Sequence, residues 1–419
     1  MRLLLFANDY PSPWHPTKGT FNRELALALA RQHDLHVICP IPWMDAWNRR
    51  PATLHSVERV SGRHSAAPRL EVHYPRYYYP PKLLRNQYGW FYWQSVRGTV
   101  RRVVASSMPE AVLAYWAHPD GEVAVRVASQ LGIPSGVIVG GSDVLLITTN
   151  IGRRRRVVNV LERADAIFAV SRHLKSAVTG LGVGSQKVHV WRQGIDASLF
   201  GPGDGRAARF RLNIAPEEAM LLWVGRMVPV KGLDVLVAAC AVLRHRGVTF
   251  RLYLVGDGPL RGQLEARVVA AGLSGVVTFV GPRQPEHLGD WYRAADVTVL
   301  PSLSEGLPNV LRESHACGTR FVASRVGGIA EIAREGLDRL TAPGDARDLA
   351  DALCDVLSRA GASFTPPPPT DAVSWEESAD SLVTVLAGLA RTRRNSELRP
   401  GAAPRAERWV SAGLGDSLR

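Results

Sequence analysis

Short apolar runs alternate with helical patterns along most of the chain. Near the start, the apolar run from Arg2 to Ala7 is followed by a polar loop, the helical pattern ELALALARQ and a second apolar run in HDLHVICP. This order of strand, loop, helix and strand is typical of a sheet covered by helices on both faces. The sequence therefore predicts an α/β protein that opens with a doubly wound unit.

The second half of the chain repeats this alternation in four strand-to-helix units. They are MLLWVGRMVPVKGLDVLVAACAVL, FRLYLVGDGPLRGQLEARV, VVTFVGPRQPEHLGDWYRAAD and the stretch from Val297 to Gly318. Parallel strands joined by helices all end at the same edge of a sheet. We therefore expect the polar residues that follow these strands to share one edge: Arg226, Lys231, Asp257, Arg283, Glu305 and Glu313.

The length of 419 residues fits two domains rather than one core. We expect a first Rossmann-like domain over residues 1–200 and a second over residues 201–365, entered through the glycine-rich GPGDGR. The amphipathic pattern of SWEESADSLVTVLAGLAR predicts a last helix within residues 366–390. Residues 391–419 carry seven arginines against three acids, a net charge of 7 − 3 = +4, and we expect a disordered basic tail.

The composition, with 46% apolar and 21% charged residues, is that of a soluble globular protein. No apolar run reaches the roughly 20 residues of a membrane span, and MRLLLF is too short for a signal peptide. Four cysteines without disulfide or metal spacing favour a reducing compartment. We expect a cytoplasmic protein, with peripheral attachment to the inner face of the plasma membrane as an open alternative. The net charge of +13 fits nucleic acid or an anionic membrane and does not choose between them.

A window between Val72 and Pro109 combines aromatic and basic residues and contains no acidic one. Three interpretations stay open: a core with solvated arginines, a surface for anionic lipid headgroups, and stacking on single-stranded nucleic acid. No nucleic-acid-binding signature accompanies the window, so we expect no nucleic-acid partner. The residues are Tyr74, Arg76, Tyr77, Tyr78, Tyr79, Lys82, Arg85, Tyr88, Trp90, Phe91, Tyr92, Trp93, Arg97, Arg101 and Arg102.

The most specific chemistry lies in PSLSEGLPNVLRESHACGTRFVASRVGG, between Pro301 and Gly328. A buried strand ends at Pro301, and Pro308 suits the first turn of the helix that follows. A helix N-terminus after a strand is an anion-binding position, because its amides and dipole face the ligand. Glu305 and Glu313 frame this terminus and could accept hydrogen bonds from a sugar and from a ribose. The alternative is that both are solvated surface acids.

Arg226 and Lys231 lie five residues apart in GRMVPVKG. A guanidinium that forks onto phosphate oxygens, with an ammonium beside it, would stabilise the charge that grows on a departing pyrophosphate. No Asp-x-Asp pair is placed to hold a divalent ion, so the sequence predicts no metal and no cofactor besides the substrate. A dinucleotide fingerprint is not supported either, because no complete GxGxxG is present.

The first half offers weaker candidates at the ends of its strands. Gly19 lies near a helix start, where it lets the backbone approach a ligand. Tyr115 and His118 follow the strand in AVLAYWAHPDG, and Asp143 follows the strand in IPSGVIVGGSD. A lone histidine such as His118 is more often structural.

These motifs resemble the large group of retaining glycosyltransferases numbered family 4. The matching elements are GRMVPVKGLD, LVGDGPL, FVGPRQPEHL, AADVTVLPSLSEGLPNVLRESHACG and VGGIAEI, with weaker matches in VSRHLK, GIDASLF, GGSDV, WAHPDG and SWEES. The resemblance covers residues 1–390 approximately and is stronger in the second half. It implies the GT-B fold, in which two Rossmann-like domains face each other across a cleft and a C-terminal helix returns to the first domain.

The resemblance also implies residue roles. Arg226 and Lys231 would grip the pyrophosphate of a UDP-, GDP- or ADP-sugar, Glu313 would hold the ribose, and Gly19 would close over the phosphate. Glu305 and the backbone after it would contact the donor sugar, and Arg283 would face the base. The implied donor site comprises Gly19, Arg226, Lys231, Gly256, Asp257, Arg283, Glu305, Gly306, Leu307, Pro308, Asn309 and Glu313.

One departure concerns the catalytic histidine. Many relatives carry His-x-His where this chain has Leu113-Ala114-Tyr115. The histidine's implied role is to contact the transferred sugar, and here either His118 or Tyr115 would take that role. The implied catalytic set is then His118, Arg226, Lys231 and Glu305, with front-face transfer of a hexosyl-type sugar to a lipid-linked or envelope polysaccharide acceptor. The resemblance also implies that Tyr115 and Asp143 lie on the acceptor side. Two alternatives stay open: a noncatalytic subunit that binds the nucleotide sugar, and an epimerase of the same fold.

Overall fold

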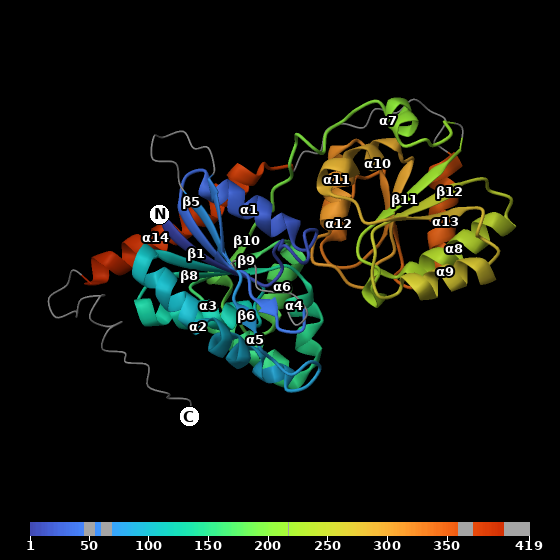
Figure 1. The fold of residues 1–419 in the computed structure, drawn as a ribbon. Coiled ribbons are helices and arrows are strands. Elements are labelled where there is room, and N and C mark those ends of the chain that lie inside the picture. Colours follow the sequence, from blue (N-terminus) through green and yellow to red (C-terminus); the bar gives the residue numbers. More distant parts are fainter. Residues whose placement is uncertain (46–54, 60–68, 217, 359–371, 398–419) are drawn as a thin grey trace. The chain divides into compact units, whose positions relative to one another are not determined.

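The computed structural model describes residues 1–45, 55–59, 69–216, 218–358 and 372–397. The chain forms two compact units (Figure 1). Unit 1 comprises Met1–Gly194 and Trp375–Arg419, and unit 2 comprises Ile195–Ser374. The chain therefore passes between the units after Gly194 and after Ser374. The sequence had predicted these borders after residues 200 and 365.

Unit 1 is built on one sheet with the strand order β10-β9-β8-β7-β1-β2-β5-β4. All neighbours are parallel except β4, which runs antiparallel to β5 at the edge. The winding direction reverses between β1 and β7, which makes their carboxyl ends a topological switch point. The strands are β1 (Arg2–Ala7), β2 (Asp34–Ile38), β4 (His55–Arg59), β5 (Arg69–His73), β7 (Ala111–Tyr115), β8 (Ser135–Val139), β9 (Ala166–Ala169) and β10 (Val188–Val190).

Helices cover both faces of this sheet (Figure 1). On one face lie α1 (Thr20–Ala30) and α14 (Trp375–Glu397), and on the other lie α2 (Tyr88–Ser107), α3 (Asp120–Leu131) and α5 (Ile151–Arg163). Alternate residues of β1 point to opposite faces, so Leu4 and Phe6 pack against α2 and α3. Smaller elements are β3 (Ile41–Pro42), β6 (Arg76–Tyr77), α4 (Ser142–Leu145) and α6 (Arg172–Gly180).

The last helix, α14, belongs to unit 1, as the returning helix of the predicted fold should. Trp191 Nε1 donates to the carbonyl of Ser378 at 3.0 Å, and Arg393 donates to the carbonyl of Ile133 at 2.7 Å and pairs with Asp165. These contacts hold the helix beyond its expected end. The prediction of disorder is therefore wrong for residues 391–397, and its remainder, 398–419, lies outside the described residues.

Unit 2 has a parallel six-stranded sheet with the order β13-β12-β11-β14-β15-β16. This is the doubly wound order in which the first and fourth strands are neighbours, so its switch point lies between β11 and β14. The strands are β11 (Met220–Val224), β12 (Arg251–Val255), β13 (Val277–Gly281), β14 (Val297–Leu300), β15 (Phe321–Ser324) and β16 (Arg339–Thr341).

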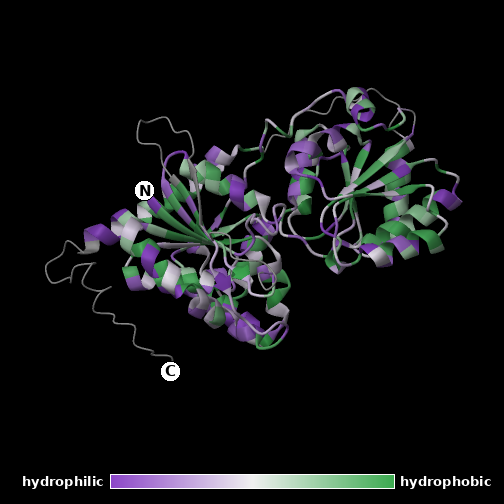
Figure 2. Cartoon of the chain, viewed as in Figure 1, coloured by the Kyte–Doolittle hydropathy of each residue, from purple (hydrophilic) through white to green (hydrophobic). Residues whose placement is uncertain are grey.

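The helices of unit 2 complete two hydrophobic layers, one on each face of the sheet. Figure 2 shows the resulting pattern, with apolar strands inside and polar residues on the outer sides of the helices. One face carries α8 (Leu233–His245), α9 (Arg261–Ala270) and α13 (Ala346–Ser358), and the other carries α7 (Gly205–Arg211), α10 (Leu288–Ala294) and α11 (Asn309–Ala316); α12 spans Ile329–Ile332.

None of the described helices is long and apolar enough to cross a membrane.

Candidate functional site

Two loops meet at the switch point of unit 2. The loop after β11 carries residues 225–232, and the loop after β14 carries residues 301–308. They are joined by a hydrogen bond from the amide of Leu303 to the carbonyl of Val230 at 2.8 Å. Gly232 has a positive φ of 62°, and a Cβ there would lie 2.0 Å from the carbonyl oxygen of Pro301. Only glycine allows this approach, which brings the two loops into contact.

Lys231 and Glu305 form an ion pair across these two loops, with Lys231 Nζ 2.6 Å from Glu305 Oε1. Their side chains are 23% and 10% exposed, so both charges are largely removed from water. Arg226, at the start of the first loop, is exposed, and its side chain has no partner within the described part of the chain. The site thus combines one paired cation and one cation that is free to bind an anion.

The backbone after Glu305 is arranged to donate hydrogen bonds. Within the described chain, the amides of Glu305, Gly306 and Leu307 have no acceptor. The loop is fixed from behind by the amide of Gly328, which donates to the carbonyl of Gly306 at 2.8 Å. Pro308 caps α11 rather than forming its first turn, and Asn309 is its first residue. Free amides in front of a helix N-terminus form an anion-binding site.

Two buried polar atoms, one in this loop and one on the first residue of α11, also have no hydrogen-bond partner among the described protein atoms. They are Ser302 Oγ and the side-chain oxygen Oδ1 of Asn309. Buried polar groups are normally satisfied by protein, water or ligand. Their position beside the free amides indicates that the loop is built to meet a polar group.

Glu313 lies on α11 and is partly buried. The hydroxyl of Tyr292 on α10 donates to Glu313 Oε2 at 2.7 Å. Burial raises the pKa of the Glu313 carboxyl, and the Tyr292 hydrogen bond partly opposes this change. The interpretation of Glu305 and Glu313 as solvated surface acids is therefore wrong, because both are paired inside the unit. Tyr292 was missed by the sequence analysis, since no spacing links it to Glu313.

The three remaining predicted residues of unit 2 lie at the ends of β12 and β13. Gly256 has a φ of 133°, and a Cβ there would lie 1.8 Å from the carbonyl oxygen of Gly225. Asp257 is exposed and accepts from the amide of Gly258 at 2.8 Å. Arg283 is exposed and donates to the carbonyl of Pro282 at 3.0 Å. The structure thus places Gly256 against the Arg226 loop but gives Arg283 no contact with the Lys231–Glu305 pair.

At the switch point of unit 1, a polar network joins the ends of β1 and β7. Asp120 accepts from the amide of Asn8 at 2.7 Å and from its side-chain amide at 3.1 Å. Lys18 Nζ lies 3.0 Å from Asp9 Oδ1. Burial raises the pKa of Asp120 to about 7. Gly19 has a φ of 64° and packs on the carbonyl of Asp9, where a Cβ would lie at 2.1 Å.

The other candidates of unit 1 are buried. His118 is 5% exposed, with Nδ1 3.3 Å from a Glu122 carboxylate oxygen and Nε2 3.4 Å from the carbonyl oxygen of Arg85. Tyr115 donates to Gln193 at 3.4 Å. Asp143 accepts from the amides of Ala117 and Gly141 at 3.1 and 3.0 Å, and burial raises its pKa to about 6. Among the described atoms, Nδ1 of His118 has no hydrogen-bond partner. The roles of all three residues toward substrate stay predictions.

The aromatic window divides between core and surface. Tyr74, Tyr77, Tyr92 and Trp93 are buried, so the core interpretation is confirmed for these four. Tyr78 and Trp90 are exposed, together with Leu83 and Leu84 in the turn before α2. Trp90 and Trp93 also line a cavity of about 280 Å³ in unit 1, beside Gln87, Gly89, Glu122, Val123, Arg126 and Arg156.

Comparison with known proteins identifies the family of this chain. The model of Glycosyltransferase Family 4 matches residues 18–199, and the model of Glycosyl transferases group 1 matches residues 218–359. The chain belongs to this glycosyltransferase family. A D-inositol 3-phosphate glycosyltransferase of Geodermatophilus obscurus is 34% identical over 285 residues, which cover 62% of each protein. The chain spans about half to three fifths of the length of the curated relatives it matches.

Solved structures share the fold. Sucrose-phosphate synthase from Thermosynechococcus elongatus matches 94% of this chain and 98% of its own, with a TM-score of 0.72 and 21% identity. Anabaena Alr3699/HepE in complex with UDP-glucose matches 94% and 99%, with a TM-score of 0.63 and 19% identity. At these identities the likeness concerns the fold alone, and it confirms the predicted GT-B class. The cleft between the domains stays a prediction.

Proposed function

We propose that this protein transfers a hexosyl-type sugar from a nucleoside diphosphate sugar to an acceptor hydroxyl, and that unit 2 binds the donor. The observation that carries the proposal is the Lys231–Glu305 pair at the switch point of unit 2, beside the unpaired Arg226 and the free amides after Glu305. This arrangement matches a diphosphate linked to a polar sugar. The names of the relatives and the UDP-glucose complex of a structural neighbour support it.

Each residue has a chemical role in this proposal. Arg226 and Lys231 bind the pyrophosphate, and the α11 N-terminus faces the same charge. Glu313 accepts hydrogen bonds from the ribose hydroxyls, and Glu305 contacts the sugar. The bond between the anomeric carbon and the phosphate oxygen breaks, and the acceptor oxygen bonds to that carbon on the same face. The acceptor proton passes to the leaving phosphate oxygen, so configuration is retained and no carboxylate nucleophile is required.

Two cations and several amides provide the charge that such a leaving group needs. We therefore propose that transfer does not require a divalent ion. A guanidinium and an ammonium held before the reaction stabilise the developing pyrophosphate charge without reorganisation, which is the usual source of a large rate gain.

The acceptor is proposed to be lipid-linked or a growing envelope polysaccharide. The exposed apolar residues Leu83, Leu84 and Trp90 lie beside Lys82 and Arg85, a combination suited to an anionic bilayer surface. Inositol 3-phosphate, named for the relatives, is the competing acceptor. A membrane-bound acceptor predicts that vesicles with anionic lipid retain the protein, and that the variant Leu83→Ala/Leu84→Ala/Trp90→Ala does not bind. Phe210→Ala, at an exposed aromatic in unit 2, is the matched control.

The donor is tested first by thermal unfolding with UDP-, GDP- and ADP-sugars, because a ligand that binds only the folded state raises Tm. The nucleotide that shifts Tm is then used with lipid-linked, saccharide and inositol phosphate acceptors, and proton NMR determines the anomeric configuration of the product. Binding without transfer or hydrolysis would support the noncatalytic subunit, and an epimerised donor would support the epimerase. Inversion of the anomeric centre would contradict the front-face mechanism.

A further inference from the structure

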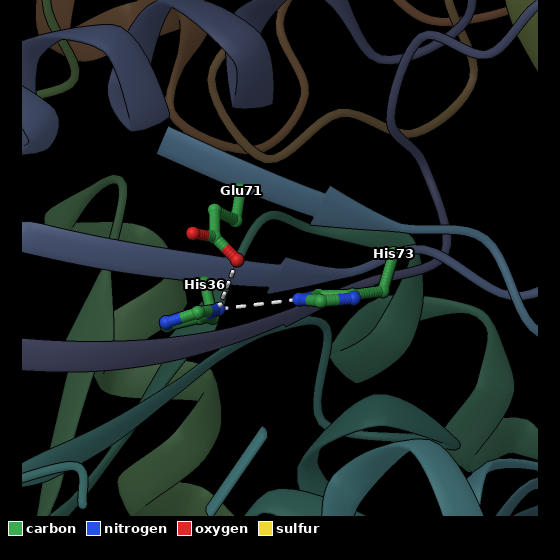
Figure 3. Close-up of side chains that lie close together, drawn as sticks. All are labelled: His36, Glu71 and His73. Carbon is green, nitrogen blue, oxygen red and sulfur yellow. Dashed lines mark hydrogen bonds and ion pairs between the residues drawn. The ribbon is translucent and has the colours of Figure 1, made fainter. Parts of the chain in front are cut away.

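A cluster of three potential metal ligands lies in unit 1, on a different part of the sheet from the switch point. It consists of His36 on β2 and of Glu71 and His73 on β5 (Figure 3). His36 Nδ1 lies 3.2 Å from His73 Nε2 and 3.6 Å from Glu71 Oε2. All three ligand atoms lie within 4.8 Å of one another. The two imidazoles and the carboxylate thus converge on one small volume.

Strand register explains why these side chains meet. His36 is paired with Glu71 in the parallel β2–β5 ladder, and His73 follows Glu71 by two residues on the same strand. Side chains of paired residues, and of residues two apart, share one face of a sheet. This face also carries Leu4 and Ile38, which belong to the core beneath α2. Three half-buried polar side chains therefore share this face with apolar core residues.

We propose that His36, Glu71 and His73 bind one zinc ion. Zinc binds histidine nitrogen and carboxylate oxygen at about 2.0–2.2 Å, so tetrahedral ligand atoms lie roughly 3.4 Å apart. The observed separations of 3.2 and 3.6 Å fall on either side of this value. A water molecule would complete the four-coordinate geometry that zinc prefers. Two imidazoles and one carboxylate favour zinc over magnesium and calcium, which select oxygen ligands.

Partial burial suits such a site. The side chains of His36 and Glu71 are 12% and 18% exposed, so an ion can reach them while most of the surrounding water is excluded. The zinc ion would cross-link β2 to β5, whose ligands His36 and His73 are 37 residues apart in the sequence. The unfolded chain does not hold these ligands together, so zinc would bind the folded state preferentially and stabilise the part of the unit 1 sheet around β2 and β5. This role is independent of the proposed sugar transfer.

The test uses the full chain without a polyhistidine tag, stripped with chelator and dialysed. Zinc content after equilibration and calorimetric titration with ZnCl₂ should give about one equivalent for the natural chain. Saturating zinc, at about one hundred times Kd, should raise Tm by roughly 5 °C or more. MgCl₂ at the same concentration should leave Tm unchanged. His36→Gln and His73→Gln should each weaken binding at least about tenfold and lose the Tm shift.

Two controls keep the outcome clear. His245→Gln removes an exposed histidine of unit 2 and should bind zinc like the natural chain. Glu71→Gln keeps the size of the side chain and loses its charge, so it tests the site if a histidine variant does not fold. The proposal is overturned if the natural chain binds no stoichiometric zinc, or if His36→Gln and Glu71→Gln bind it as tightly as His245→Gln does. Nucleotide binding by unit 2 should be unchanged in every variant.

Discussion

Lys231 and Glu305 are 74 residues apart in the sequence, and their charged atoms lie 2.6 Å apart in unit 2. The pair exists because β11 and β14 are neighbours in the sheet, so the loops that follow them share one edge. Both side chains are largely buried. A ligand with a diphosphate and a sugar would find a cation and a hydrogen-bond acceptor already positioned together.

Lys231→Ala should reduce sugar transfer by at least about 100-fold, because the variant loses a preorganised cation where pyrophosphate charge develops. It should also lower the free energy of unfolding by about 1–3 kcal/mol, because Glu305 is left largely buried without its partner. Steady-state kinetics and denaturant titration measure the two effects. Lys175→Ala, on α6 of unit 1, is the matched control and should change neither. Full transfer activity in Lys231→Ala would remove the lysine from the proposed mechanism.

Glu313 is the second carboxylate to test. Glu313→Ala should reduce sugar transfer at least tenfold, because the variant lacks the carboxylate that is proposed to accept hydrogen bonds from the ribose hydroxyls. Isothermal titration with the nucleoside diphosphate should show the loss in affinity as well as in rate. An unchanged affinity would assign Glu313 to packing with Tyr292 alone.

Tyr292→Phe should weaken nucleotide binding by about 3- to 10-fold, since it removes the hydrogen bond that holds the Glu313 carboxylate. That bond lowers the pKa of Glu313, so its loss raises the pKa further above the ordinary value. The carboxylate is then protonated at a higher pH, and the decline of nucleotide affinity on acidification should begin at a higher pH. Tyr253→Phe, at a half-buried tyrosine on β12 of the same unit, should leave the pH profile unchanged. Identical profiles for Tyr292→Phe and the natural chain would contradict the coupling.

Gly256→Ala should destabilise unit 2 by about 2 kcal/mol or more, because the new Cβ would lie 1.8 Å from the carbonyl oxygen of Gly225 at a φ that disfavours alanine. Denaturant titration measures the change. Gly262→Ala, on α9 of the same unit, meets no atom within 4 Å and should be neutral or stabilising by up to about 1 kcal/mol. Equal stability of the two variants would show that the loop relaxes around the added methyl group.

Asp120 should make unit 1 less stable as the pH rises. Its pKa is raised by burial to about 7 in the folded protein, above the value near 3.8 of an exposed aspartate. Between these two values the unfolded chain releases a proton that the folded chain still holds, so the free energy of unfolding falls with increasing pH. Relative to Asp120→Asn, the natural chain should lose stability from about pH 4 to pH 7. A pH-independent difference between the two proteins would contradict this assignment.

The alternation of apolar runs and helical patterns was sufficient to predict two doubly wound units, because burial of parallel strands on both faces leaves a strong signal in sequence. Proline located the N-terminal end of α11 to within one residue, although Pro308 caps the helix instead of entering it. The motif residues Lys231 and Glu305 could be predicted to share an edge, since that follows from strand direction alone.

Contacts between residues distant in the sequence required the tertiary structure. Tyr292 on α10 donates a hydrogen bond to Glu313 on α11, and Asp120 at the start of α3 accepts one from Asn8 at the end of β1. Neither pair has a sequence spacing from which its contact could be predicted. The aromatic window divided into core and surface only when the face of each residue was known.

The sequence by itself determined the class of fold and the types of charged residue at the donor edge, because periodicity and strand direction are local properties of a chain. Tertiary structure decided which charges pair, which acids are buried, and that His36, Glu71 and His73 converge. Strand order and register determine these distances, and they are set by packing over the whole sheet.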